Sequence, residues 1–251
     1  MKKNNLFYQL YDTLYASKDY AGEVASIMSI AKTTHPGMIK KILEIGCGTG
    51  NHTVELAKTK KKITAIDTDV NMAATAKTKT KNLKNVRIHF GSVEKLDENG
   101  FELVIAAFNV VTYIQDMKSL LLFFQGVSSS LRNKGIFIFD CWNGIAAIKD
   151  PPQTKIIKCN AGGKKIICEI KSHTDLFNQK TKLEYFLKTS DKRKNTVTKD
   201  SFSFNQTLWT PAQLIYALEE NNFQVLECCK NFLPGKRADE SDWKIMFVCK
   251  K

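Results

Sequence analysis

The sequence of 251 residues lacks a long apolar run, a cysteine pair at metal-binding spacing and a histidine cluster. No stretch is apolar enough to cross a bilayer, and no apolar segment follows the N-terminal lysines, which argues against a membrane protein and a secreted precursor. The seven cysteines and four histidines show no ligand spacing, so we predict neither a disulfide framework nor a metal site. We expect a cytoplasmic protein with reduced cysteines and no membrane partner.

Arginine is also scarce, although the net charge is +13. Lysine supplies nearly all of this charge. The sequence has no repeated arginine fork and no alternation of basic and aromatic residues that would stack on bases. This pattern disfavours nucleic acid as a partner, and small anionic molecules, phosphorylated or nucleotide-linked, fit the charge better.

A glycine-rich turn lies between two strand-like segments. The apolar run Ile42–Ile45 is followed by Gly46, Gly48 and Gly50, and a second apolar run ends on Asp67. Glycines let the backbone come within hydrogen-bonding reach of a ligand because no Cβ intervenes. An acid at the end of the next parallel strand can accept hydrogen bonds from both ribose hydroxyls. The pattern predicts a site for a nucleoside-containing cofactor; an ordinary tight turn, with Asp67 capping the next helix, is the structural alternative.

The spacing of the glycines selects among nucleoside cofactors. Dinucleotide sites use Gly-x-Gly-x-x-Gly, whose helix N-terminus faces a pyrophosphate, whereas here the glycines are Gly46, Gly48 and Gly50. Glu44, inside the first strand, would repel a pyrophosphate and suits a cofactor with a free amino group. The segment resembles motif I of the class I S-adenosylmethionine (SAM) dependent methyltransferases. This resemblance implies SAM as cofactor and S-adenosylhomocysteine as product.

The resemblance also implies roles for residues along the cofactor. Asp67 would bind the ribose hydroxyls, and Glu44 would bind the ammonium group directly or through water. Met72 would pack on the adenine or belong to the core. Backbone at Ala107 and Phe108, where the fourth strand ends, flanks the transferred methyl group in this family. The rest of the expected cofactor site comprises Tyr20, Cys47, Thr68, Ser92 and Val93.

The third strand departs from the family pattern. It ends Phe90-Gly91-Ser92-Val93, where the family usually has Gly-Asp and the acid accepts a hydrogen bond from the adenine amino group. Ser92 can still accept this hydrogen bond, but less strongly than a carboxylate. The departure does not affect the predicted fold.

The acceptor would lie at the carboxyl ends of the fourth and fifth strands, where open α/β folds bind ligands. The expected substrate contacts are Tyr11, Asn109, Tyr113 and Trp142. Tyr113 is equally compatible with a core position, and Asp140 with a helix cap. A hydroxyl acceptor needs a general base, for which we predict His52, Asp140 or Tyr15. An amine acceptor needs none.

The N-terminus contains a second motif, since residues 11–20 are Tyr-Asp-Thr-Leu-Tyr-Ala-Ser-Lys-Asp-Tyr. This segment is similar to the opening of bacterial SAM-dependent N-methyltransferases that act on nucleotide-linked amino sugars. The resemblance implies that Tyr15 lines the acceptor pocket and that Tyr20 reaches the cofactor carboxylate. The alternative role of both tyrosines is to anchor the N-terminal helix.

Strand-like and helical segments alternate in the order of a doubly wound α/β sheet. We predict a Rossmann-like methyltransferase fold with a seven-stranded, mostly parallel sheet, preceded by one helical segment over residues 7–31. The predicted strands cover residues 41–45, 63–67, 86–90, 103–108, 135–140, 223–228 and 243–249, the last lying antiparallel between strands five and six. A period-two, lysine-rich pattern after residue 150 predicts an antiparallel β lid inserted after strand five. The expected domains are 1–150 for the N-terminal helix and SAM-binding core, 151–208 for the lid and 209–251 for the completion of the core.

Together these features predict a SAM-dependent methyltransferase of a small polar molecule. An activated, nucleotide-linked sugar is the best candidate, with N-methylation favoured slightly over O-methylation. Two other functions stay open: a SAM- or nucleoside-binding regulatory module without turnover, and an RNA methyltransferase. A homodimer is compatible with the sequence.

Overall fold

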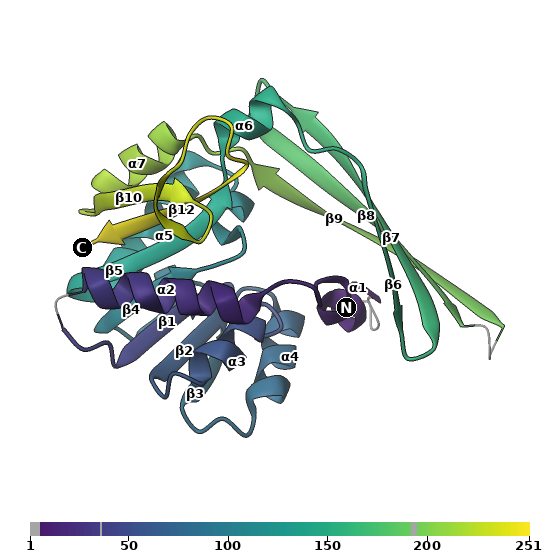
Figure 1. Cartoon of the computed structure of the whole chain (residues 1–251), viewed down its shortest axis with the longest axis horizontal. Helices are drawn as coiled ribbons and strands as arrows, with labels where there is room; N and C mark the ends of the chain where they lie inside the picture. The colour runs from purple at the N-terminus through teal and green to yellow at the C-terminus, as the bar shows by residue number, and fades with distance from the viewer. Residues whose placement is uncertain (1–5, 36, 192–194) are drawn as a thin grey trace.

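The computed structural model describes residues 6–35, 37–191 and 195–251. These residues form two sheets, and helices cover both faces of the larger one (Figure 1). The larger sheet has eight strands in the order β11-β10-β12-β5-β4-β1-β2-β3. Its strands are β1 (Lys41–Ile45), β2 (Lys62–Asp67), β3 (Val86–Phe90), β4 (Phe101–Ala106), β5 (Leu131–Trp142), β10 (Gln224–Lys230), β11 (Leu233–Arg237) and β12 (Lys244–Lys250).

Strand pairing in the larger sheet confirms the predicted doubly wound arrangement. β3, β2, β1, β4 and β5 are parallel neighbours, and β12 runs antiparallel between β5 and β10. The carboxyl ends of β1, β2 and β4 therefore meet at one edge, where the strand order reverses. The sheet has one strand more than predicted, because β11 pairs with the edge of β10. Pro234 and Gly235 hide this strand in the sequence, and such residues are tolerated at a sheet edge.

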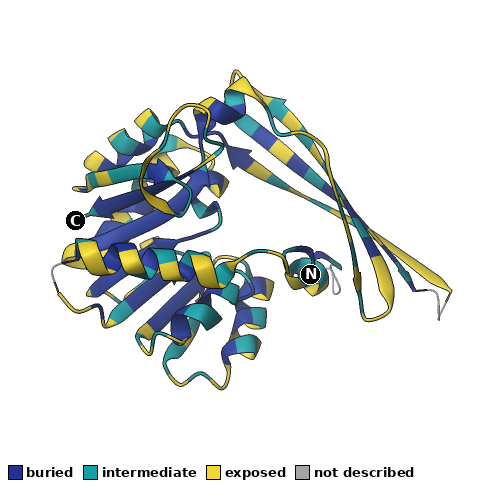
Figure 2. Ribbon diagram, viewed as in Figure 1, coloured by how far each residue is buried: buried dark blue, intermediate teal, exposed yellow. Residues whose placement is uncertain are grey.

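Two apolar layers hold the helices against this sheet. α2 (Tyr20–Thr34), α3 (Asn51–Ala57) and α4 (Val70–Thr80) cover one face, and α5 (Met117–Ser130) and α7 (Pro211–Glu219) cover the other. Phe124, Phe137 and Phe139 are fully buried in the second layer, and burial of each stabilises the fold by roughly 1.5–3 kcal/mol. Figure 2 shows the result: the central strands are buried, and the outer faces of the helices carry the exposed residues.

The N-terminal segment is two helices rather than the one predicted. α1 (Leu6–Leu14) ends before residues 15–19, and α2 begins at Tyr20. Asp19 caps α2, because its side chain accepts a hydrogen bond from Gly22 N at 2.8 Å, so a new helix starts here. The break lets α1 turn away from the sheet and lie against the second sheet.

The smaller sheet is the lid predicted after strand five. It comprises β6 (Lys155–Ala161), β7 (Lys164–Asp175), β8 (Lys180–Asp191) and β9 (Thr196–Thr207), all antiparallel. α6 (Gly144–Lys149) leads into it from β5. One face of the lid packs on α1, and Figure 2 shows its strands alternating between buried and exposed residues. The lid therefore stands over the carboxyl edge of the larger sheet with α1 beneath it (Figure 1).

Candidate functional site

The glycine turn after β1 adopts a conformation that side chains disfavour. Gly46, Gly48 and Gly50 have φ angles of +68°, +56° and +85°, all in the left-handed region. A Cβ on Gly46 would also lie 2.5 Å from Cγ2 of Val110, in the short helix η2 (Val110–Tyr113) that follows β4. The turn therefore places bare backbone close to the end of β4.

Asp67 supports this turn from the end of β2. Its Oδ2 accepts a hydrogen bond from Gly48 N at 2.7 Å, and its Oδ1 accepts one from Asp69 N at 2.8 Å. Burial raises the pKa of the Asp67 carboxyl, and the two backbone hydrogen bonds oppose the rise. Each carboxylate oxygen has a further lone pair, so Asp67 can accept a hydrogen bond from a ribose hydroxyl while it supports the turn.

Glu44 lies under the turn. It is only 2% exposed, and its Oε2 accepts a hydrogen bond from Thr53 Oγ1 at 2.6 Å. Burial raises the pKa of this carboxyl to about 7. The folded protein therefore holds Glu44 mostly protonated at pH 5 and mostly ionised only above neutral pH.

Glu44 should make the protein less stable as the pH rises. A carboxyl whose pKa is higher in the folded than in the unfolded chain binds its proton more tightly when folded, so its contribution is complete below the unfolded pKa and is lost as the pH rises through the folded one. With a pKa of about 7 against the usual 4.5, we expect a loss of about 2 kcal/mol between pH 5 and pH 7. Urea unfolding of the wild type and of Glu44→Gln at both pH values measures this loss, and equal losses in the two proteins would contradict the assignment.

A cavity of about 530 Å³ opens between the turn, the ends of β2 and β4, α1 and the lid. Its volume is in the range of small-molecule sites. Asp67, Asp69 and Glu94 line it on the β2 and β3 side, and within the described part of the chain no lysine, arginine or histidine does. The other lining residues are Phe7, Tyr11, Ile45, Gly46, Gly48, Ile66, Thr68, Met72, Gly91, Ser92, Val93, Ala107, Phe108, Val110, Tyr113, Ile114, Phe123 and Phe204. This acidic and aromatic wall favours a positively charged ligand.

Comparison with known proteins relates the chain to methyltransferases. Residues 42–135 match the family described as "Methyltransferase domain". A malonyl-[acyl-carrier protein] O-methyltransferase of Bacillus cereus is 39% identical over 85 residues, which are 32% of this chain and 31% of that protein. An S-adenosylmethionine-dependent methyltransferase from Clostridium acetobutylicum has the same fold, with a TM-score of 0.81 and 20% identity over 98% of both chains. Residues 42–135 therefore match a methyltransferase domain, and the chain has the fold of a SAM-dependent methyltransferase.

Two further facts describe how the chain relates to known methyltransferases. The chain spans about a third to a half of the length of the curated relatives that it matches. A sugar N-methyltransferase from Streptoalloteichus sp. superposes with a TM-score of 0.79 at 18% identity, over 99% of this chain and 95% of that one. At this identity the likeness establishes the fold alone.

The size and the acidic wall of the cavity fit SAM. The predicted cofactor contacts that line it are Gly46, Gly48, Asp67, Thr68, Met72, Ser92, Val93, Ala107 and Phe108, whereas Tyr20, Glu44, Cys47 and Gly50 do not line it. The Tyr20 hydroxyl is buried and has no hydrogen-bond partner among the described residues. A buried polar group without a partner is unusual, but Tyr20 is outside the described lining of the cavity. The contacts to SAM stay predictions.

None of the three predicted bases is in the described lining of the cavity. His52 Nε2 contacts Glu23 Oε2 at 2.8 Å. Asp140 is buried and accepts a hydrogen bond from Phe108 N. Burial raises the pKa of Tyr15 to about 12, so this phenol keeps its proton at neutral pH and cannot take one from an acceptor.

The end of β4 is strained. Phe108 and Asn109 have φ angles of +73° and +62°, which are uncommon for residues other than glycine. These two residues turn the chain sharply, and Asp140 holds the turn through Phe108 N. Of the predicted substrate contacts, Tyr11 and Tyr113 line the cavity, and Asn109 and Trp142 do not. Strained backbone of this kind clusters at ligand sites.

Sequence reasoning missed several lining residues. Glu94 lines the cavity from the short helix η1 (Val93–Lys95), two positions after Ser92. A carboxylate here can supply the strong hydrogen-bond acceptor that the Ser92 side chain does not provide. The family's usual acid stands at the position of Ser92, so the acid two positions later in the sequence could have indicated this contact. Phe7 and Phe204 also line the cavity, with ring centroids 5.5 Å apart. No local pattern pairs residues so distant in the chain.

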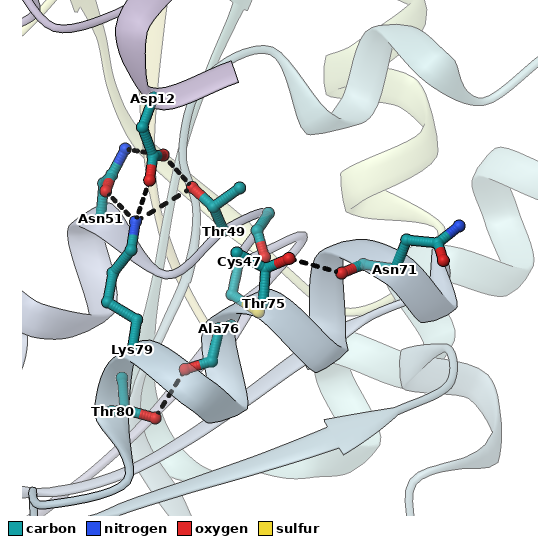
Figure 3. A network of polar contacts seen from close by, with 10 residues as sticks. Asp12, Cys47, Thr49, Asn51, Asn71, Thr75, Ala76, Lys79 and Thr80 are labelled. Carbon is teal, nitrogen blue, oxygen red and sulfur yellow. Dashed lines mark hydrogen bonds and ion pairs between the residues drawn. The ribbon is translucent and has the colours of Figure 1, made fainter. Parts of the chain in front are cut away.

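A polar network ties α1 to the glycine turn (Figure 3). Asp12 accepts hydrogen bonds from Thr49 Oγ1 at 2.5 Å, from Asn51 Nδ2 at 3.1 Å and from Lys79 Nζ at 2.7 Å. Burial acts to raise the pKa of Asp12, but the hydrogen bonds from Lys79 and Thr49 outweigh it and leave this pKa below its usual value. The turn and α4 therefore hold α1 in place over the cavity.

The described residues form neither a metal-binding group nor a membrane-spanning helix. In the ranges 6–35, 37–191 and 195–251, no group of three or more His, Cys, Asp or Glu side chains is arranged to hold a metal ion. No helix within these ranges is long and apolar enough to span a bilayer. The seven cysteines are unpaired, and most are buried.

Proposed function

We propose that the protein transfers a methyl group from SAM to an amino nitrogen of a small polar molecule, and that its substrate class is an activated, nucleotide-linked amino sugar. When bound, SAM supplies a sulfonium methyl group: the nitrogen lone pair forms the new N–C bond, the C–S electron pair stays with sulfur, and the nitrogen releases a proton to water. For this displacement the protein has to hold the acceptor close, aligned and dry.

The observation that carries the proposal is the composition of the cavity wall near the end of β4. Tyr11, Phe108 and Tyr113 line this part of the wall. Burial raises the pKa of both tyrosines, so their hydroxyls keep their protons at neutral pH. A hydroxyl acceptor needs a base to remove its proton, whereas an amine brings its own lone pair. The wall therefore supports nitrogen over oxygen.

Other features support a sugar-like, nucleotide-linked acceptor. Residues 11–20 resemble the opening of N-methyltransferases that act on nucleotide-linked amino sugars, and one structural neighbour is a sugar N-methyltransferase. The net charge of +13 attracts an anionic molecule at long range, while the acid-lined cavity favours its amino group. The lid and α1 stand over the cavity and can exclude water during transfer.

Incubation with SAM and paired substrates tests the proposal. The pairs are nucleotide-linked amino sugars and the same sugars with a hydroxyl in place of the amine. We expect mass spectrometry to find one added methyl group on the amino sugars only, at a rate that rises with pH toward the pKa of the acceptor amine, because the amine has to lose its own proton. Methylation of the hydroxyl sugars or of RNA overturns the proposal. SAM binding without turnover of any panel member also overturns it and would indicate a regulatory module.

A further inference from the structure

Six aromatic rings form a continuous arc around the end of the cavity next to β4. We call them the aromatic arc: Tyr113, Phe204, Phe7, Tyr11, Tyr15 and Phe108. Successive ring centroids along it are 5.6, 5.5, 5.4, 4.8 and 5.2 Å apart, mostly edge to face. All but Tyr15 line the cavity. The rings come from η2, β9, the N-terminal segment and the end of β4, so only the folded chain brings them together.

The aromatic arc is accessible from the cavity. Tyr113 is 45% exposed even though burial raises the pKa of its hydroxyl, because protein atoms surround the ring while one side of it faces the cavity. Tyr11, Phe108 and Phe204 are half-buried. Large rings that stay half-buried in the wall of a cavity offer their faces to a ligand.

The electrostatics of the aromatic arc favour a cation. Burial is the main cause of the raised pKa values of Tyr11 and Tyr113, and the negative charge of Asp67 adds to it. The charge of Asp67 therefore acts at this end of the cavity. Lys18, which is outside the described lining, already lies over Phe108 with its Nζ 4.5 Å from the ring centroid, and Glu23 pairs with its charge. Aromatic faces in a negative field attract alkylammonium groups.

We propose that the aromatic arc is a cation–π site for the ammonium group that forms on the acceptor nitrogen as it is methylated, and that the substrate is an alkylamine whose carbon substituents fit between the rings. This inference rests on the proposed function and adds the groups that recognise the reacting nitrogen. During transfer the positive charge passes from sulfur to nitrogen, where the rings stabilise it. The product then leaves without breaking an ion pair.

Choline and 3,3-dimethyl-1-butanol test the aromatic arc, because they have the same shape and differ in charge. Calorimetric titration of each into the full chain, saturated with S-adenosylhomocysteine, measures the preference. We expect choline to bind about 3- to 30-fold more tightly. Phe204→Leu and Tyr113→Leu should remove most of this preference, and Tyr113→Phe should keep it. Phe177→Leu, at a ring that is 95% exposed between β7 and β8, is the matched control and should change nothing.

The wild-type comparison decides the question even where a variant does not fold. Equal affinities for the two probes, or no measurable choline binding, overturn the inference. A full preference for choline in Phe204→Leu and Tyr113→Leu overturns it as well. Binding of S-adenosylhomocysteine without a preference for choline refutes only the inference about the aromatic arc. Failure to bind S-adenosylhomocysteine refutes the proposed function.

Discussion

Gly46→Ala is expected to abolish measurable SAM binding and to lower the free energy of unfolding by about 2–5 kcal/mol. Gly46 has a φ of +68°, and a Cβ there would lie 2.5 Å from Val110 Cγ2. The left-handed backbone alone costs an alanine roughly 1–2 kcal/mol, and the clash would push the glycine turn and η2 apart. Because η2 carries Tyr113, this displacement disturbs both ends of the cavity.

Gly100→Ala is the matched control for this variant. Gly100 has a φ of +77°, and a Cβ there would meet no atom of the described residues within 4 Å. We expect the control to lose about 1–2 kcal/mol of stability and to keep its affinity for SAM. Urea unfolding and calorimetric titration compare the two variants. If they behave alike, the contact between Gly46 and Val110 does not shape the site.

Asp67→Ala should weaken SAM binding by about ten- to a hundredfold. A charge-assisted hydrogen bond contributes roughly 1.5–3 kcal/mol, and about 1.4 kcal/mol corresponds to a tenfold change in affinity. The alanine removes the predicted ribose contact. It also removes the acceptor of the hydrogen bonds from Gly48 N and Asp69 N, so the turn loses a support at the same time.

Two companion variants separate these effects. Asp67→Asn keeps one acceptor oxygen for the turn and loses the charge, so we expect a smaller loss of affinity than in Asp67→Ala. Asp175→Ala removes a carboxylate that accepts a hydrogen bond from Asn178 N at 3.1 Å in the exposed β7–β8 turn, and it should not change SAM affinity. Calorimetric titration with SAM measures all three. Unchanged affinity in Asp67→Ala would refute the placement of the ribose at the end of β2.

Local patterns predicted most strands because neighbouring residues carry the signal. β1 and β3 have the predicted bounds: β1 is mostly apolar, and β3 alternates apolar with polar residues. β4 ends at Ala106 rather than at residue 108, because Phe108 and Asn109 are left-handed, and residues other than glycine give no local sign of that conformation. The break between α1 and α2 was missed although Asp19 is a good N-cap residue.

The candidate site also has residues that the sequence predicts and residues that it does not. The cofactor end is formed by a turn and by the residues that end neighbouring parallel strands, and the predicted contacts Gly46, Asp67 and Met72 line the cavity there. His52 and Asp140 were predicted to act on the acceptor, but neither is in the described lining of the cavity, and they are paired with Glu23 and Phe108 N. Spacing along the chain cannot tell a side chain that faces the cavity from one that supports its wall.

The amino-acid sequence by itself determines the order of the strands along the chain, the glycine turn and the acid after it. These features follow from backbone conformation and strand periodicity, which are local properties. The acceptor end follows from packing: α1 reaches over the sheet and meets β9, so that Phe7 and Phe204, from opposite parts of the chain, share one wall. Which rings face the cavity depends on how the lid and α1 bury their other side chains, and burial is a property of the assembled fold.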